Sequence, residues 1–196
     1  DSVASRGLGD VYKRQDLKWY SENELNQQLL DIQERGTKPS NPLPYNFHVN
    51  LDNGKIRMTN LRDNGVPLLL YDKNRLNTDH YHFSYALYAQ QELSHDVQSG
   101  AYDYEVFGPN GFFRKFKGDA TPDCEVLFIN NPSKNQIELV FKNHKKAGLA
   151  INIEDLYEKN KKEVPLKKTE EKIILDLTKN KGWYDLKVTL AGHIWH

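Results

Sequence analysis

The side chains that could do chemistry are few and scattered along the 196-residue chain. Cys124 is the one cysteine, and no nucleophile signature surrounds it. His80 and His82 stand two residues apart, a strand spacing that can present two imidazoles to one metal ion, but no motif links His95 and Asp96 to them. We therefore expect solvated surface histidines here rather than a metal centre.

Two aspartates suggest general acid–base chemistry, because Asp103 and Asp185 each follow a tyrosine in a similar motif. A catalytic carboxylate pair must converge on one substrate, at about 5–10 Å in glycosidases. Equivalent positions of repeated units normally face separate environments, so we expect a structural role in a turn or toward a neighbouring strand. The sequence thus predicts no catalytic, cofactor-binding or metal-binding residue in this chain.

One cluster of aromatic and basic residues suits a lipid headgroup layer, in which rings enter the interface and cations meet phosphates. It follows the turn Pro109-Asn110-Gly111, and its two successive phenylalanines cannot both face inward on a regular strand. The alternative is ordinary alternation, with one ring in the core and the charges in water. The predicted contact residues are Phe112, Phe113, Arg114, Lys115 and Lys117.

The elements that must position these residues are short strands. Stretches with a period of two follow Tyr45 and are separated by turns such as Asp52-Asn53-Gly54. They predict a mainly β fold built from small antiparallel β-sandwiches of the immunoglobulin or fibronectin kind. The predicted strands cover residues 45–50, 55–61, 67–72, 80–88, 91–97, 101–107 and 112–117.

The second half of the sequence repeats the first. The Gly-x-Tyr-Asp motif at residues 100–103 recurs 82 positions later at residues 182–185, and upstream strands recur at offsets of 83 and 80. We expect two tandem sandwiches, at residues 42–118 and 119–196. The second should be truncated at its last strand, which would leave a paired sheet edge exposed.

Residues ahead of the strands form two further segments. Residues 1–15 show no period and look like a translated sequencing adaptor, so we expect an extraneous or disordered tail. Residues 16–41 predict one short amphipathic helix, with a capping box from Ser21 to Glu24, and then a proline-rich linker.

The composition excludes several classes of protein. Lysine and arginine number 27 and aspartate and glutamate 27, so no global field attracts nucleic acid. The hydrophobic fraction of 38% is too low for one large core, while 8 Phe, 3 Trp and 11 Tyr are too many for a disordered chain. No apolar run reaches the roughly 18 residues of a transmembrane segment.

Several motifs, taken together and in order, resemble the C-terminal region of bacterial phosphocholine-specific phospholipase C, which carries two tandem copies of a small domain. The resemblance covers residues 16–196. The motifs are Gln33-Glu34-Arg35-Gly36-Thr37-Lys38-Pro39, Leu43-Pro44-Tyr45, Gly100-x-Tyr102-Asp103, Gly108-Pro109-Asn110-Gly111-Phe112, Arg114-x-Phe116-x-Gly118 and Gly182-Trp183-Tyr184-Asp185-Leu186.

The resemblance implies a secreted or periplasmic parent enzyme that hydrolyses phosphatidylcholine or sphingomyelin to diacylglycerol or ceramide and phosphocholine. It also implies a phosphatase-like catalytic domain in the same parent chain, whose nucleophile and metal motifs are not found in this sequence. We therefore expect a non-catalytic accessory fragment that needs no cofactor, packs on that domain and contacts phospholipid. The alternative is a free-standing adhesion or carbohydrate-binding module that stacks Tyr81 or Trp195 on sugars.

Overall fold

A computed structural model describes Ser21, residues 43–145 and residues 148–196. Residues 42–196 form one unit, which holds every strand described below. The predicted tail, amphipathic helix and linker lie outside the described residues, apart from Ser21.

The described chain folds into strands, as the alternating pattern predicts. The first sandwich consists of β1 (Phe47–Asp52), β2 (Lys55–Asn60), β3 (Val66–Asp72), β4 (His82–Leu87), β5 (Glu92–Asp96), β6 (Tyr102–Phe107) and β7 (Phe113–Gly118). The second consists of β8 (Cys124–Asn131), β9 (Gln136–Asn143), β10 (Leu149–Asp155), β11 (Asn160–Leu166), β12 (Glu170–Asp176), β13 (Leu186–Leu190) and β14 (His193–Trp195). All the strands predicted in the first sandwich are present, with ends shifted by at most two residues.

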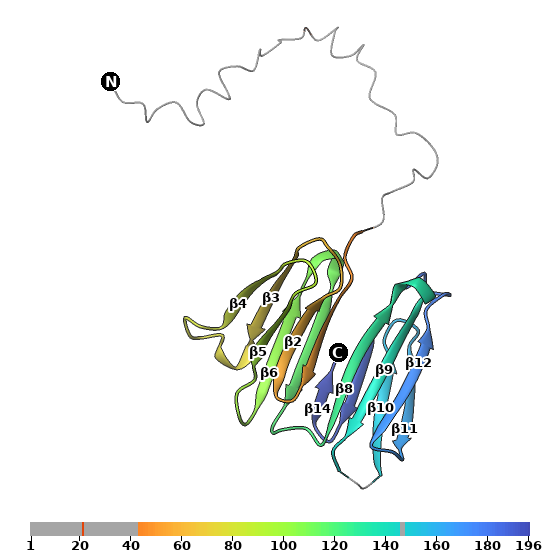
Figure 1. The fold of residues 1–196 in the computed structure, drawn as a ribbon. Coiled ribbons are helices and arrows are strands. Elements are labelled where there is room, and N and C mark those ends of the chain that lie inside the picture. Colours follow the sequence, from red (N-terminus) through yellow and green to blue (C-terminus); the bar gives the residue numbers. More distant parts are fainter. Residues whose placement is uncertain (1–20, 22–42, 146–147) are drawn as a thin grey trace. The chain divides into compact units, whose positions relative to one another are not determined.

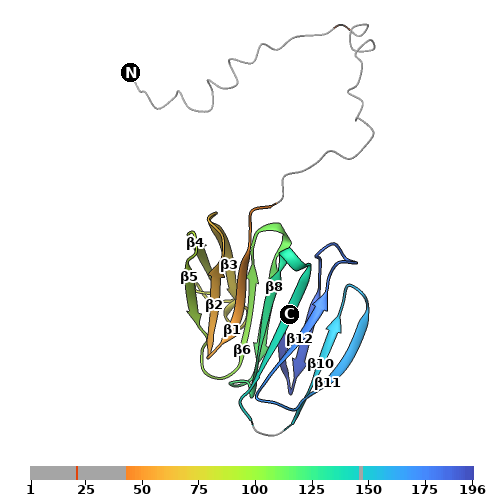
Figure 2. The same cartoon turned by 45° about the vertical axis from the view of Figure 1, so that its right-hand side comes forward.

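Both sandwiches use one strand order. An eight-stranded sheet runs β11-β10-β13-β14-β7-β6-β3-β4, and the two smaller sheets are β1-β2-β5 and β12-β9-β8 (Figures 1 and 2). Each sandwich therefore contributes four strands to the large sheet and three to a small one, which is a β-sandwich architecture. The predicted boundary between residues 118 and 119 falls between β7 and β8, and it stays a prediction.

Alternation and turn chemistry explain why these segments form strands. In β6, Tyr102, Tyr104 and Val106 are buried while the residues between them face outward. Between β1 and β2, Asn53 and Gly54 take φ values of 50° and 68°. That pair of positive φ angles is what a two-residue type I′ hairpin requires, and Asn-Gly supplies it with little strain.

The large sheet is continuous because the two sandwiches pair with each other through β7 and β14. The Lys115 N–H donates to the His196 carbonyl at 2.7 Å, and the His196 N–H donates to the Lys115 carbonyl at 2.9 Å. Val106 and Val188 are equivalent residues of the two sandwiches; Arg114 pairs with the first and Trp195 with the second. The residues that follow, Lys115 and His196, therefore occupy equivalent positions. The contact is thus self-complementary, as in a two-fold dimer, and the predicted exposed edge is wrong.

The small sheets also meet, through side chains instead of a backbone ladder. The Asn50 amide accepts from the Phe128 N–H at 2.8 Å and donates to the Phe128 carbonyl at 3.2 Å, as a backbone peptide would. Lys142 Nζ lies 2.8 Å from Asp52 Oδ1 across the same junction. One cluster of buried apolar side chains runs through both sandwiches, so the two expected thin cores are joined.

Candidate functional site

The residues predicted to contact lipid are divided between the two faces of the sheet. Phe112 packs against Phe47, with ring centroids 4.6 Å apart. Phe113, Lys115 and Lys117 face outward from β7, because side chains alternate along a strand.

Arg114 faces inward and is only 6% exposed. One guanidinium nitrogen donates to the Tyr184 hydroxyl at 2.7 Å, and another to the Phe113 carbonyl at 3.0 Å. The guanidinium carbon lies 4.9 Å from the ring centre of Phe112 and 4.8 Å from that of Phe128. This differs from the predicted surface position, because strand alternation turns Arg114 into the junction between the sandwiches.

The outward lysines are paired with carboxylates of β6. Lys115 Nζ lies 2.7 Å from Glu105 and 3.0 Å from Asp103, and Lys117 Nζ lies 3.3 Å from Asp103. Burial opposes the charge of Lys115, but the hydrogen bonds and charges of these carboxylates outweigh burial and raise its pKa.

The aspartates of the repeated motif pair with the last strand of their own sandwich. Asp103 contacts Lys115, and Asp185 contacts the equivalent residue, His196, at 2.5 Å. Strands β7 and β14 separate Asp103 from Asp185, so the two carboxylates do not converge on one substrate. The carboxylates of Asp103 and Asp185 therefore contact side chains of neighbouring residues and not backbone amides.

The tyrosines of the same motif reach the other sandwich. The Tyr102 hydroxyl is 3.2 Å from His193 Nδ1 on β14, while the Tyr184 hydroxyl accepts from Arg114 on β7. Gly118 leaves room for this junction, because a Cβ there would collide with the His193 ring and lie 2.7 Å from the Tyr102 hydroxyl. The repeated Tyr-Asp motif therefore assembles the junction.

The histidines considered for a metal centre point in different directions. His82 is exposed beside Tyr71 on the outward face. His95 packs against Phe83, with its Nδ1 2.7 Å from the Tyr85 hydroxyl, and burial lowers its pKa. Within the part of the chain that the structure describes, no group of three or more His, Cys, Asp or Glu is arranged to hold a metal ion.

Cys124 is fully buried at the start of β8. Burial, followed by the charge of Glu125, raises the pKa of its thiol to about 11. A thiol that stays protonated at neutral pH and is closed to solvent is a packing residue and not a nucleophile.

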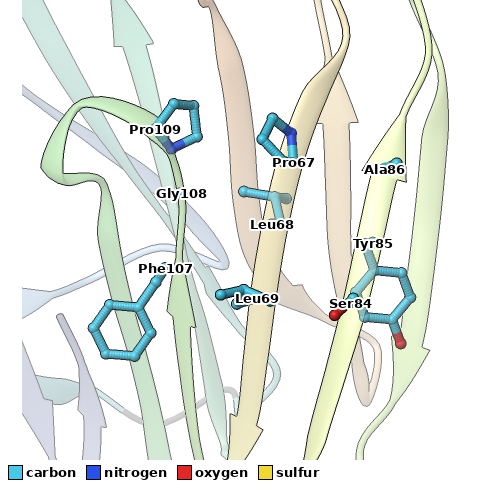
Figure 3. A pocket seen from close by; sticks show the side chains of 9 residues that line it. All are labelled: Pro67, Leu68, Leu69, Ser84, Tyr85, Ala86, Phe107, Gly108 and Pro109. Carbon is cyan, nitrogen blue, oxygen red and sulfur yellow. The ribbon is translucent and has the colours of Figure 1, made fainter. Parts of the chain in front are cut away.

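The most unusual surface is the outward face of the first sandwich's part of the large sheet. A groove of about 520 Å³ opens there between β3, β4 and the turn after β6. Figure 3 shows its floor as two rows across the strands, Phe107–Leu69–Ser84 and Pro109–Pro67–Ala86. Leu69 is 42% exposed and Phe107 40%. Large apolar side chains so exposed next to one another are typical of a binding surface.

A row of rings extends this face on both sides of the groove. Phe107 contacts Tyr71, with ring centroids 5.7 Å apart, and Phe113, at 5.3 Å. Phe113 in turn meets His196 at 5.3 Å, and Tyr71 meets Tyr81 at 6.2 Å. We call the set Pro67, Leu69, Tyr71, Ala86, Phe107, Pro109 and Phe113 the apolar face.

The second sandwich is polar at three of the equivalent positions and apolar at others, where it has Ala150, Pro165 and Ile194. Leu69 lies between Phe107 and Ser84 in the first sandwich, and its counterpart Asn152 lies between Thr189 and Glu163. Likewise Tyr71 has the counterpart Glu154, which lies opposite Lys161 on one neighbouring strand and opposite Lys187 on the other. The fold therefore does not need apolar side chains at the positions of Leu69, Tyr71 and Phe107.

Sequence reasoning missed the apolar face, although a signal exists. Leu68, Leu69 and Leu70 are consecutive in a strand, so one of them must face away from the core. The signal is weak because a strand covered on both faces gives the same run. Only the large-sheet order, which places Phe107 beside Leu69, shows that the outward side chains gather.

Comparison with known proteins gives a consistent result. Residues 39–119 match the family described as "Bacterial phospholipase C, C-terminal domain". The chain is 26% identical over 195 residues to a non-hemolytic phospholipase C of Burkholderia pseudomallei, with 85% of this chain and 27% of the relative covered. It is 23% identical over 215 residues to the hemolytic phospholipase C of Pseudomonas aeruginosa, with 84% and 29% covered.

A third relative extends the pattern. The non-hemolytic phospholipase C of Pseudomonas aeruginosa is 25% identical over 181 residues, which cover 82% of this chain and 26% of that protein. The chain thus spans between a quarter and a third of the length of these relatives. In agreement with the motifs noted in the sequence, the comparisons support a C-terminal region of a bacterial phospholipase C: the family matches residues 39–119, and similarity to the three relatives extends over more than four-fifths of the chain.

Proposed function

We propose that the chain is the non-catalytic C-terminal accessory region of a phospholipase C, in a parent protein that is secreted or periplasmic. The parent would hydrolyse phosphatidylcholine or sphingomyelin to diacylglycerol or ceramide and phosphocholine. Residues 42–118 and 119–196 would be tandem copies of one sandwich that packs on the catalytic domain. The observation that carries an accessory role is the apolar face, in which Leu69 is 42% and Phe107 40% exposed although the second sandwich has polar residues at these two positions.

The chemistry of the described residues supports a role in binding rather than in catalysis. The Cys124 thiol is buried, Asp103 and Asp185 contact Lys115 and His196, and His95 is hydrogen-bonded to the Tyr85 hydroxyl. Among the described residues, no helix is both long and apolar enough to cross a membrane.

Phosphocholine release tests this proposal. The 196-residue chain and its parent enzyme would each be incubated with phosphatidylcholine vesicles. We expect release by the parent and none by the chain alone. Release by the chain alone would overturn the accessory role, and a parent that releases no phosphocholine would overturn the phospholipase assignment.

Direct contact with a phospholipid surface through Phe112, Phe113, Lys115 and Lys117 remains a second proposal, with weaker support. Only Phe113 and the lysines face outward, and both lysines already pair with carboxylates. Co-sedimentation with liposomes should fall in a Phe113→Ala, Lys115→Ala variant if the contact exists. Unchanged co-sedimentation would contradict it.

The carbohydrate-binding alternative loses one of its two named residues. Trp195 is fully buried between the sheets and cannot stack on a sugar. Tyr81 is partly exposed, but it leans on Tyr71 and His82.

A further inference from the structure

The fold does not require Leu69 and Phe107 of the apolar face, because the second sandwich folds with Asn152 and Thr189 at these positions. Leaving two large apolar side chains about two-fifths exposed costs hydration free energy. A partner that covers these two side chains would recover this free energy. The question is which partner.

Charge next to the face disfavours an anionic lipid surface. The outward carboxylates Asp103 and Glu105 lie on β6, the strand that carries Phe107. They are the partners of Lys115, and Glu105 also pairs with Lys73 at 3.4 Å. A surface that binds anionic lipid instead leaves an excess of unpaired lysine and arginine around its apolar residues.

The path of the chain favours a tethered partner. Phe47, the first residue of β1, packs on Phe112, and a Cβ at Gly108 would lie 3.2 Å from the Phe47 ring. Gly108 and Pro109 line the groove (Figure 3), so the chain enters the first sandwich near them, on the core side of the sheet. No such approach exists for the polar counterpart, since β8 continues directly from the first sandwich.

We propose that the apolar face is the docking surface for the catalytic domain of the parent enzyme, which lies outside this 196-residue chain. This rests on the proposed function, and on relatives in which a domain of this C-terminal kind accompanies nearly three-quarters of further chain. A partner joined next to the groove has a high effective concentration there, so a face of moderate size suffices. The occupant presents apolar side chains to the groove.

Cysteine labelling tests the docking directly. Leu69→Cys places a thiol in the groove, and Asn152→Cys places one at the equivalent position of the second sandwich. The native Cys124 is buried and serves as an internal reference. Maleimide reaction rates at both positions would be compared by mass spectrometry in the 196-residue chain and in the parent enzyme.

We expect position 69 to react about tenfold more slowly in the parent than in the chain, and position 152 to react about equally in both. Equal rates at position 69 would overturn the proposal. If Leu69→Cys fails to fold, Ser84→Cys and Glu163→Cys form a second matched pair on the same outward face.

Two further measurements identify a different occupant. Slower labelling of the chain alone with added phosphatidylcholine vesicles would assign the face to lipid, and slower labelling at high chain concentration would assign it to a second copy. Either result overturns the proposal. Phosphocholine release by the same parent preparation reports the proposed function separately, so protection without release would keep the docking and reject the phospholipase.

Discussion

The two sandwiches differ at their outward surfaces much more than in their strands. Both place seven strands in one order, and both use a Tyr-Asp motif at the junction. On the large sheet, however, the first shows Leu69 and Phe107 where the second shows Asn152 and Thr189. Since one backbone accepts both sets, the buried strand residues specify the fold, and the outward residues at these positions can differ without changing it.

The junction shows a second difference at one equivalent position. The first sandwich places Arg114 there and the second places Trp195, which is fully buried. Arg114 is surrounded by rings, and no ion pair to a carboxylate is found for it among the described residues. It bonds the Tyr184 hydroxyl and a carbonyl instead. Arg114 and Trp195 thus occupy equivalent positions but are stabilised differently, Trp195 by burial of its ring and Arg114 by hydrogen bonds and aromatic contacts.

Replacing Trp195 should give the largest effect. Trp195→Ala removes a fully buried ring and should lower the free energy of unfolding by about 3–5 kcal/mol. Trp195→Phe should retain most of this stability, because the buried indole N–H has no hydrogen-bond partner among the described residues. Denaturant titration measures both, and equal losses would contradict the packing explanation.

Filling the junction should have the next largest effect. Gly118→Ala puts a methyl group against the His193 ring and the Tyr102 hydroxyl, so we expect a loss of about 1–3 kcal/mol. Gly65→Ala is the matched control, since its Cβ would make only an ordinary contact with the Leu87 carbonyl. A control variant as destabilised as Gly118→Ala would mean that general glycine effects, and not the junction, decide the result.

Acid should weaken the first sandwich and its junction. His48 and His95 both have pKa values lowered, chiefly by burial. Folding therefore favours their neutral forms, which gives stability that is present above the unfolded pKa of about 6.5 and is lost as pH falls through the folded pKa. Unfolding titrations between about pH 7.5 and 5.5 should show this slope. A His48→Gln, His95→Gln variant with an unchanged slope would disprove the assignment.

Making the apolar face polar should have the smallest effect on the chain itself. A Leu69→Asn, Phe107→Thr variant copies the second sandwich, so the free energy of unfolding of the 196-residue chain should change by no more than about 0.5 kcal/mol. Thermal or denaturant unfolding measures it. A loss above about 2 kcal/mol would show that the face supports the fold after all.

Much of the fold was predictable from sequence because alternation and turn residues act locally. The strand from Tyr102 to Phe107 and the hairpin at Asn53-Gly54 follow directly from those patterns. The joining of the sandwiches was not predictable, because the pairing of Lys115 with His196 depends on two strands that lie far apart in sequence.

The candidate site was predicted only in part, for the same reason. Phe113, Lys115 and Lys117 do face outward, as alternation requires. Arg114, predicted as a lipid contact within the cluster of aromatic and basic residues, is buried, and the rings of Phe128 and Tyr184 from the other sandwich explain its burial. Leu69 and Phe107 gather only once the strand order of the large sheet is known.

The most direct test of the central claim compares one substitution in two settings. In the parent enzyme, Leu69→Asn with Phe107→Thr should destabilise the C-terminal region by about 2–4 kcal/mol, because both side chains lose an apolar partner there. In the 196-residue chain the same change should be nearly neutral. Equal effects in the two settings would mean that the apolar face has no partner in the parent, and would contradict the account.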